Sequence, residues 1–381
     1  MHLIHLTMLV LASQQVIHHL GPGAVASACQ DGTATVDRQD EARAVVEALL
    51  AHDRSISSIE CQQEVAVRRL VAANPQGGEW DEWAVIRNGR FGEDSSGNWY
   101  FRGQNGGRST PDGPVTLHED AFVSDTFHTV AFRPGANLYI IWEPQQHPRY
   151  FPGPFQALGR WLDTSGTKRL GELLLDADDL TIQDVDGDDG LILLRGEAMI
   201  DGVLSMLLVT VDRTRSFAPV VIRRFDANHN YLAEVIMNEA FELVEGVHVP
   251  SRGTRTLYTR AGPSPEETRG YDAALQRAAM KLKRSVDDPQ VVREAASAFW
   301  GQDGWPVTPV GGVMNRYHFV TFHSINRGLD TDSMRVRIAP DAAVFNNING
   351  LDNNPQEGEP LQKVIEGYPF DLPPFHVPAS M

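Results

Sequence analysis

The chain has 381 residues, a net charge of −17 at pH 7 and a pI near 5.1, and 42% of its residues are hydrophobic. This length allows one large domain or two ordinary ones, with a sizeable core. The negative charge argues against nucleic acid and against an anionic membrane surface as partners, because like charges repel.

The first 28 residues differ from the rest of the chain. Leu3–Ala12 is nearly continuously apolar, and Ala26–Ala28 supplies small residues before Cys29, which is typical of a secretory leader and its cleavage site. The leader lacks the usual Lys or Arg, so a ragged N-terminus is the alternative. The apolar run is too short to span a membrane. We expect a leader at 1–28, a polar linker at 29–36 and a periplasmic or envelope location.

The chain has two cysteines, Cys29 and Cys61. In an exported protein they can form one disulfide. Alternatively, Cys29 is lipid-modified, or both thiols are unpaired and buried. Lipid anchoring is the less favoured alternative, because a large aliphatic residue is usual three places before such a cysteine.

A helix followed by a long strand is predicted after the linker. Asp37 is the expected N-cap, with Asp40 and Glu41 in the first turn, where the helix dipole favours acidic residues. Helical spacing then gives one apolar stripe, which predicts packing against a sheet. The stripe consists of Ala42, Val45, Val46, Leu49 and Leu50. The strand is expected at Ile56–Val71.

Hairpins and two short helices are predicted between Trp83 and Leu175. Asn88-Gly89 is expected to be a hairpin turn, since this dipeptide is the strongest short turn signal. Phe122–Phe132 is expected to be a strand. The short helices are expected at Phe155–Leu162 and Lys168–Leu175.

Residues Ile192–Pro250 predict an antiparallel meander. Short apolar runs alternate with turn signals such as Asp201-Gly202 and Glu245-Gly246, too closely spaced for helical crossovers. Both faces of the run Val203–Val211 are mostly apolar. The sheet therefore either packs a layer on each side or encloses an apolar cavity.

A helical insertion is predicted at 264–301, within a protein otherwise rich in strands. Ser264-Pro265-Glu266-Glu267 has the residues of a helix N-terminus, and Asp288-Pro289 starts a second helix. Later strands are expected at Tyr317–Ser324, Met334–Ile338 and Ala343–Phe345. An irregular tail is expected at 346–381.

Two stretches resemble the periplasmic lipoprotein-carrier fold of the LolA/LolB type. The first is Asp37–Arg69, a helix that feeds a strand containing Ile59-Glu60-Cys61-Gln62-Gln63-Glu64. The second is Leu208–Pro219, followed by Phe225-Asp226 and Phe241–Pro250, which is similar to large divergent bacterial relatives of these carriers.

The resemblance covers Asp37–Tyr258 and the late strands. It implies an α+β, mainly antiparallel fold, in which an incomplete (half-open) β-barrel wraps helices around an apolar cavity. The expected domain is 37–345. The insertion and the tail depart from the small carriers, so no functional residue is carried over.

Three local patterns could carry chemistry, and each fails where that chemistry is strictest. The acidic loop Asp184–Gly190 lacks the glycine and the bidentate glutamate that a calcium loop requires, so a solvated hairpin turn is favoured. His318 and His323, five residues apart in a predicted strand, cannot chelate one metal together. Ser165-Gly166-Thr167-Lys168 has the Ser-x-x-Lys of acyl-enzymes without its partner motifs. We expect no metal, no cofactor and no enzymatic activity.

The sequence therefore predicts an exported, non-enzymatic binding protein that buries lipid, lipoprotein acyl chains or another apolar ligand. The candidate cavity-lining residues are Val46, Leu50, Val85, Trp142, Leu207, Val209 and Ile236. One alternative is an envelope structural protein with a self-filled core, which binds a protein partner through 264–301. The weaker alternative is a hydrolase built from scattered acidic residues and histidines.

Overall fold

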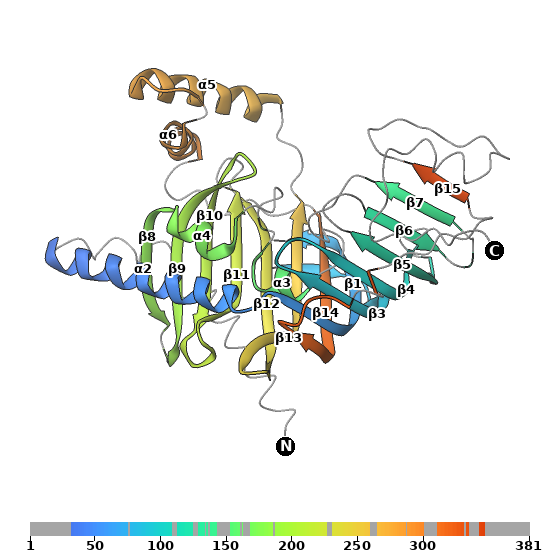
Figure 1. Ribbon diagram of the computed structural model, residues 1–381. Coiled ribbons are helices and arrows are strands. Elements are labelled where there is room, and N and C mark those ends of the chain that lie inside the picture. Colours follow the sequence, from blue (N-terminus) through green and yellow to red (C-terminus); the bar gives the residue numbers. More distant parts are fainter. Residues whose placement is uncertain are drawn as a thin grey trace.

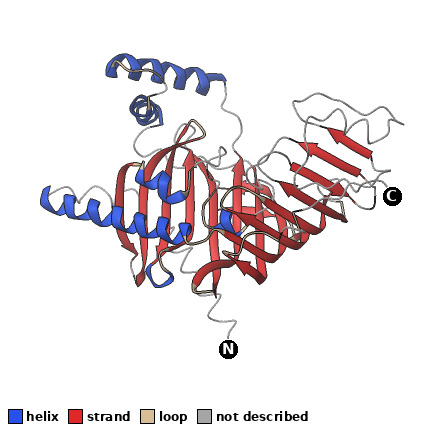
Figure 2. Ribbon diagram, in the orientation of Figure 1, coloured by secondary structure: helices blue, strands red, loops and turns tan. Residues whose placement is uncertain are grey.

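The computed structural model describes most of the chain between Gly32 and Asn346. The described residues are 32–74, 77–108, 113–124, 129–133, 135, 138–142, 153–160, 162, 168–185, 187–226, 231–259, 265–286, 288–300, 311–330, 333–334 and 343–346. Strands dominate these residues, and helices lie over one face of the sheet that the strands form (Figures 1 and 2). The predicted leader 1–28 and most of the tail lie outside the described residues.

One 15-stranded sheet contains all the described strands. Its order is β15-β7-β6-β5-β4-β3-β1-β14-β13-β12-β11-β10-β9-β8, with β2 paired to β1 beside this path. The strand pairs are antiparallel except for β15 against β7, which is parallel. The sheet is open, with β8 at one edge and β15 at the other, and it curves between them (Figure 1).

The strands are long in the centre of the sheet and short toward the β15 edge. Their bounds are β1 Ser58–Asn74, β2 Gly77–Trp80, β3 Ala84–Asp94, β4 Trp99–Arg108, β5 Val115–Ser124, β6 Thr129–Arg133, β7 Leu138–Trp142, β8 Asp178–Val185, β9 Asp188–Ile200, β10 Val203–Asp212, β11 Ala218–Asp226, β12 Tyr231–Val244, β13 Val247–Thr259, β14 Gly311–Ile325 and β15 Ala343–Asn346.

The helices form two groups. Helices α2 (Gly32–Arg54), α3 (Pro154–Ala157) and α4 (Leu170–Leu175) pack on one face of the sheet, which we call the inner face. Helices α5 (Pro265–Leu282) and α6 (Pro289–Trp300) pack against each other beyond the upper ends of β9 and β10 in Figure 1. The two helices predicted within 264–301 are therefore present, and they pack as a pair.

The predicted meander is confirmed, because β9 to β13 pair in chain order. Asp201 and Gly202 form one tight turn with φ values of 53° and 76°. Glu245 and Gly246 form another, with 49° and 85°. Positive φ at both central residues is the geometry that joins twisted antiparallel strands through two-residue loops.

The turn predicted at Asn88-Gly89 is wrong, since both residues lie inside β3. Gly89 pairs directly with Gly103 of β4. A Cβ on Gly89 would lie 2.8 Å from Gly103 Cα, so glycine at this position serves a close backbone approach and not a turn.

Several element boundaries also differ from the prediction. Helix α2 begins at Gly32, so Asp37 lies inside the helix instead of at its N-cap, and the expected linker overlaps the helix. The single strand expected at Phe122–Phe132 is split between β5 and β6. Most of the strand expected at Met334–Ile338 lies outside the described residues.

Candidate functional site

An apolar layer between α2, α4 and the strands β8–β12 is the largest buried cluster among the described residues. From α2 it takes the predicted helical stripe, and from the sheet it takes alternate residues of each strand. The cluster consists of Ala42, Val45, Val46, Leu49, Leu162, Leu170, Leu173, Leu174, Leu180, Ile192, Leu194, Ile200, Leu207, Val209, Val211, Ile222 and Ile236. Leu175, Ile182 and Phe217 pack at its rim and are partly buried.

Strand register explains why these side chains meet. Val209 of β10 lies opposite Ile222 of β11, which lies opposite Ile236 of β12. Directly opposite residues of a sheet point to the same face. Each of the three is at most 1% exposed, so this row is closed off from solvent.

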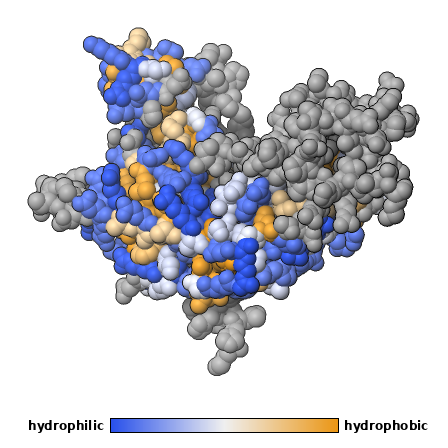
Figure 3. All heavy atoms as spheres, in the orientation of Figure 1, coloured by the Kyte–Doolittle hydropathy of each residue, from blue (hydrophilic) through white to orange (hydrophobic). Residues whose placement is uncertain are grey.

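Helix α4 packs unusually close to α2. A Cβ on Gly171 would lie 2.8 Å from Leu50 Cβ. Only glycine permits that approach, so α2 and α4 lie directly against each other. Together they cover the inner face over β8 to β11. Apolar residues also reach the surface beside α2 on this side of the molecule (Figure 3).

The structure brings together four of the seven predicted lining residues in this layer, namely Val46, Leu207, Val209 and Ile236. Leu50 is also buried, in the contact between α2 and α4.

The two remaining lining residues are placed elsewhere. Val85 needs correction, because it is 40% exposed. It pairs with Ala66, which pairs with Arg316, in a row on the opposite, outer face of the sheet. Trp142 lies at the end of β7, and its side chain is outside the described part of the structure.

The C-terminal end of α2 is fixed by a buried carboxylate. Arg160 Nε donates to Asp53 Oδ1 at 2.5 Å, and Arg169 Nη1 donates to Asp53 Oδ2 at 2.8 Å. Arg160 Nη2 also donates to the Ile56 carbonyl at 2.6 Å. Burial lowers the pKa of Arg160, and the charge of Asp53 opposes that shift. Removing one partner would leave an uncompensated buried charge.

The N-terminal half of α2 is held differently. Beside the apolar stripe, its described ion pair joins Glu41 to Arg213 at 3.8 Å, and both side chains are more than a third exposed. Exposed pairs of this kind contribute little. In Figure 1 this half of the helix extends past β8, the edge strand.

We call Asp53 with its two arginine partners the Asp53 anchor. His52 is buried next to it, and His52 Nε2 has no hydrogen-bond partner in the described structure. Burial lowers the pKa of His52, while the neighbouring Asp53 raises it and His248 lowers it further. The imidazole is therefore neutral near pH 7, and charging it would place a cation at the end of α2.

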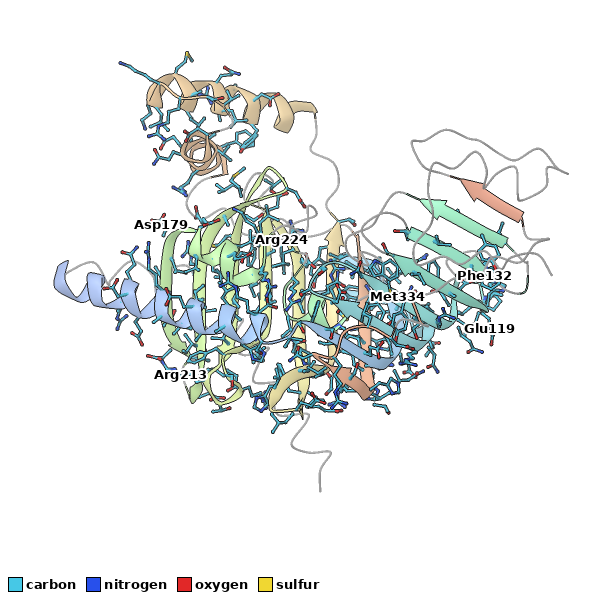
Figure 4. All side chains as sticks on the ribbon, viewed as in Figure 1. Glu119, Phe132, Asp179, Arg213, Arg224 and Met334 are labelled. Atoms are coloured by element: carbon cyan, nitrogen blue, oxygen red, sulfur yellow. The ribbon has the colours of Figure 1, made fainter. Side chains whose placement is uncertain are left out.

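A buried ion group borders the apolar layer on the same face. Arg224 and Glu234 continue the register row of Leu207, so they share its orientation toward the helices. Arg255 Nε binds Glu234 Oε1 at 2.6 Å, and Arg224 Nη2 lies 3.5 Å from Glu234 Oε2. Arg224 is labelled in Figure 4, near the upper end of the sheet. In these contacts two guanidinium groups share the carboxylate of Glu234, and Arg224 Nε has no hydrogen-bond partner in the described structure.

Sequence reasoning missed these ionic groups. The available signal was a charged residue at an inward position of an apolar strand, as Glu234 is in Leu232–Met237. Its partners could not be named, because they lie on other strands.

The described residues of the sequence patterns that lacked part of a calcium or acyl-enzyme motif lie at ordinary structural positions. The Asp184–Gly190 segment is the β8–β9 hairpin, as predicted. Ser165 lies outside the described residues, and Lys168 forms an ion pair with Asp176. Among the residues described, no group of three His, Cys, Asp or Glu side chains is placed to hold a metal ion. Cys61 is a buried free thiol. No described helix is long and apolar enough to cross a membrane.

Comparison with known proteins leaves the chain without a family. No protein-family model matches it, and no curated protein matches it significantly. A DUF1329 family protein from Desulfovibrio piger superposes with a TM-score of 0.35 at 9% identity, over 77% of this chain and 96% of that one.

Two further solved structures give similar values. A putative outer membrane lipoprotein-sorting protein domain from Vibrio parahaemolyticus has a TM-score of 0.35 at 8% identity, over 77% of this chain and 96% of that one. LprF from Mycobacterium bovis superposes with a TM-score of 0.26 at 18% identity, over 49% of this chain and 86% of that one. Likeness at this level assigns neither a family nor a function.

Proposed function

We propose that this protein is an exported, non-enzymatic binding protein that holds an apolar ligand with an anionic head between α2 and the inner face of the sheet. The observation that carries the proposal is an aliphatic layer beside two guanidinium groups that share one carboxylate, with Arg224 Nε left without a hydrogen-bond partner in the described structure. The layer would take acyl chains of a lipid or lipoprotein. Arg224 and Arg255 would meet the head, because guanidinium groups bind carboxylate and phosphate oxygens well.

Entry of the ligand requires α2 to move away from the sheet from its N-terminus as far along the helix as Leu49. Withdrawing the stripe of Val45, Val46 and Leu49 costs roughly 6 kcal/mol at about 2 kcal/mol for each side chain. An acyl chain of about fifteen methylenes contributes roughly 12 kcal/mol when buried. A single chain can therefore offset the helix displacement, while the Asp53 anchor keeps α2 attached.

The domain organisation forms part of this proposal. A secretory leader at 1–28 and a half-open barrel domain at 37–345 would deliver such a carrier to the periplasm or cell envelope. Lipid anchoring through Cys29 remains the less favoured alternative.

A second candidate function is a structural envelope protein with a self-filled core. It is favoured by the full burial of the row Val209, Ile222 and Ile236. It is also favoured by the separate core of α5 and α6, which is built from Ala274, Ala278, Ala279, Val291 and Ala295. Met280 on this helix pair is 70% exposed and available to a protein partner. In this case deleting 264–301 would abolish partner binding, and fatty acid would not bind.

The experiment that tests the first function is titration of the purified protein with a fluorescent fatty acid. Saturable binding is expected. Ile182→Trp, at the rim of the layer, is expected to weaken it about tenfold by filling the entry. Leu243→Trp is the matched control, because Leu243 is 64% exposed and distant from the layer in the register. Circular dichroism verifies that both variants fold. An absence of saturable binding to the wild-type chain would refute this function.

A further inference from the structure

Two arginines and three aromatic residues gather on the outer face of the sheet, opposite the helices. Arg68 of β1 pairs with Met314 of β14, and Arg316 lies two residues further along β14. Trp83 precedes β3, Trp80 ends β2, and Tyr258 lies on β13. The neighbours Val67 and Asn315 share the register row of Ile236, so Arg68 and Arg316 point away from the apolar layer. We call this group the outer arginine site.

The guanidinium groups stack on the indole rings. The Arg68 guanidinium carbon lies 4.5 Å from the Trp83 ring centroid and 5.2 Å from that of Trp80. Arg316 lies 4.7 Å from the same Trp83 ring. Trp80 and Tyr258 meet edge to face at 6.4 Å. Two cations are thus held against one tryptophan, with a second aromatic pair forming a wall beside them.

Neither guanidinium is bound directly by a carboxylate in the described part of the structure. Within the described ranges Arg68 and Arg316 form no ion pair with a carboxylate, in contrast to Arg255 with Glu234 and Arg160 with Asp53. The hydrogen bonds of Arg68 go to the Met314 thioether, at 3.2 and 3.3 Å, and sulfur is a weak acceptor.

The two positive charges also repel each other. Burial lowers the pKa of Arg68, the charge of Arg316 lowers it further, and Asp81 partly opposes the shift. Arg316 is exposed, so its donors remain accessible to a ligand. A bound anion would satisfy the free N–H groups and relieve the repulsion.

We propose that the outer arginine site binds the phosphate group of a phosphate ester, with Arg68 and Arg316 holding its oxygens and the tryptophans packing against the rest of the molecule. Two planar guanidinium forks suit an anion with three or four oxygens better than a single carboxylate. The indole rings and Tyr258 suit an adjoining apolar or sugar group. In a protein of charge −17, such local positive charge is needed before any anion approaches.

This site goes beyond the proposed function, because it lies on the other face of the sheet and takes a different chemical group. The phosphate can belong to a lipid headgroup or to a soluble ester. Two arms separate these sources. Isothermal titration with inorganic phosphate tests the soluble group. Sedimentation with vesicles of equal phosphatidylglycerol and phosphatidylcholine, against phosphatidylcholine alone, tests the headgroup.

The deciding variant is Arg316→Gln, because this exposed side chain can change without disturbing the fold. It is expected to weaken phosphate or phosphatidylglycerol binding by about tenfold or more, the equivalent of one lost charged hydrogen bond. Arg195→Gln is the matched control: Arg195 is exposed on the outer face of β9, outside the aromatic group. It is expected to change binding less than about twofold, the size of a distant screened charge effect.

Either arm supports the site if Arg316→Gln weakens binding and Arg195→Gln does not. The site is refuted if the wild-type chain binds neither probe, or if Arg316→Gln leaves binding unchanged. Equal losses in both variants would also refute it, because they would indicate general attraction to positive charge. Fatty-acid binding by the Ile182→Trp variant reports on the inner layer separately.

Discussion

The two halves of the sheet bury their residues in different ways. In the β8–β12 half, the inner face is aliphatic and is covered by α2 and α4. In the β3–β6 half, the inner face carries Phe91, Trp99 and Phe101, and residues of the outer face are buried as well, among them Val123. Helices α2 and α4 therefore supply the cover of the aliphatic half, whereas aromatic side chains of the strands themselves pack together in the other half.

Each half also depends on a buried carboxylate, but for a different purpose. Asp53 fixes one end of α2. Glu60 fixes the segment after β14 to the outer face, accepting from the Asp330 backbone N–H at 2.8 Å and from the Tyr100 hydroxyl at 2.8 Å. Arg90 and Ser324 also donate to Glu60, both at 3.1 Å. Burial and the bond to Glu60 raise the pKa of Tyr100, which therefore stays a donor.

The largest effect is expected from breaking the Asp53 anchor. Asp53→Ala leaves Arg160 buried without its carboxylate and should lower the free energy of unfolding by about 4 kcal/mol. Urea unfolding monitored by circular dichroism measures this. Asp176→Ala breaks the exposed pair with Lys168 and should cost less than about 1 kcal/mol. Similar losses in the two variants would contradict the anchor.

A smaller and more local effect is expected in the other half. Glu60→Ala leaves its buried donors without an acceptor and should cost about 2 to 3 kcal/mol. Hydrogen exchange should increase around Asp330 and leave α2 unchanged. Glu245→Ala provides the control, because the pair of Glu245 with Arg327 is exposed. If exchange rose in α2 instead, the two halves would not be independent.

The backbone contact between β3 and β4 should be sensitive to a single methyl group. Gly89→Ala forces the two strands apart at Gly103 and should cost about 2 kcal/mol by overpacking. Gly107→Ala, on β4, meets nothing within 4 Å and should be nearly neutral. Thermal unfolding of both variants measures the difference. Equal melting temperatures would show that the close approach is unimportant.

The smallest effect concerns pH. The pKa of His52 is lowered in the folded chain from its usual 6.5, so the unfolded chain binds a proton more readily. The stability that the neutral His52 contributes is therefore fully present above the unfolded pKa of about 6.5, and it is lost as the pH falls below that pKa. Stability measured between about pH 7 and 5.5 should therefore fall less steeply in His52→Gln than in the wild type. An equally steep fall in His52→Gln and in the wild type would contradict this contribution.

Local signals predicted much of the fold. The meander was readable because period-two apolar runs and two-residue turns are properties of neighbouring residues, as at Asp201-Gly202. The stripe of α2 was readable for the same reason. The turn prediction at Asn88-Gly89 failed because Gly89 is required by its close approach to Gly103 on another strand. No local pattern in the sequence shows that contact.

The sites were less predictable because their parts are distant in sequence. Asp53 and Arg160 are 107 residues apart, and Arg68 and Met314 are 246 apart. Val85 was misplaced because a register shift between Val65 and Ala66 reverses which β3 residues face inward. Val46, Leu207, Val209 and Ile236 lie in one buried layer because each follows the period of its own helix or strand, and their role as lining residues stays a prediction.

Binding of an acyl chain between α2 and the inner face is tested by photo-crosslinking with a fatty acid that carries a diazirine near its chain end. Mass spectrometry locates the labelled peptides. If the ligand lies between α2 and the sheet, labels are expected on α2, α4 and the inner residues of β9–β12, and unlabelled fatty acid should compete for them. Labels confined to exposed apolar residues such as Val71, Leu243 and Met280, or labels that competitor does not remove, would contradict it.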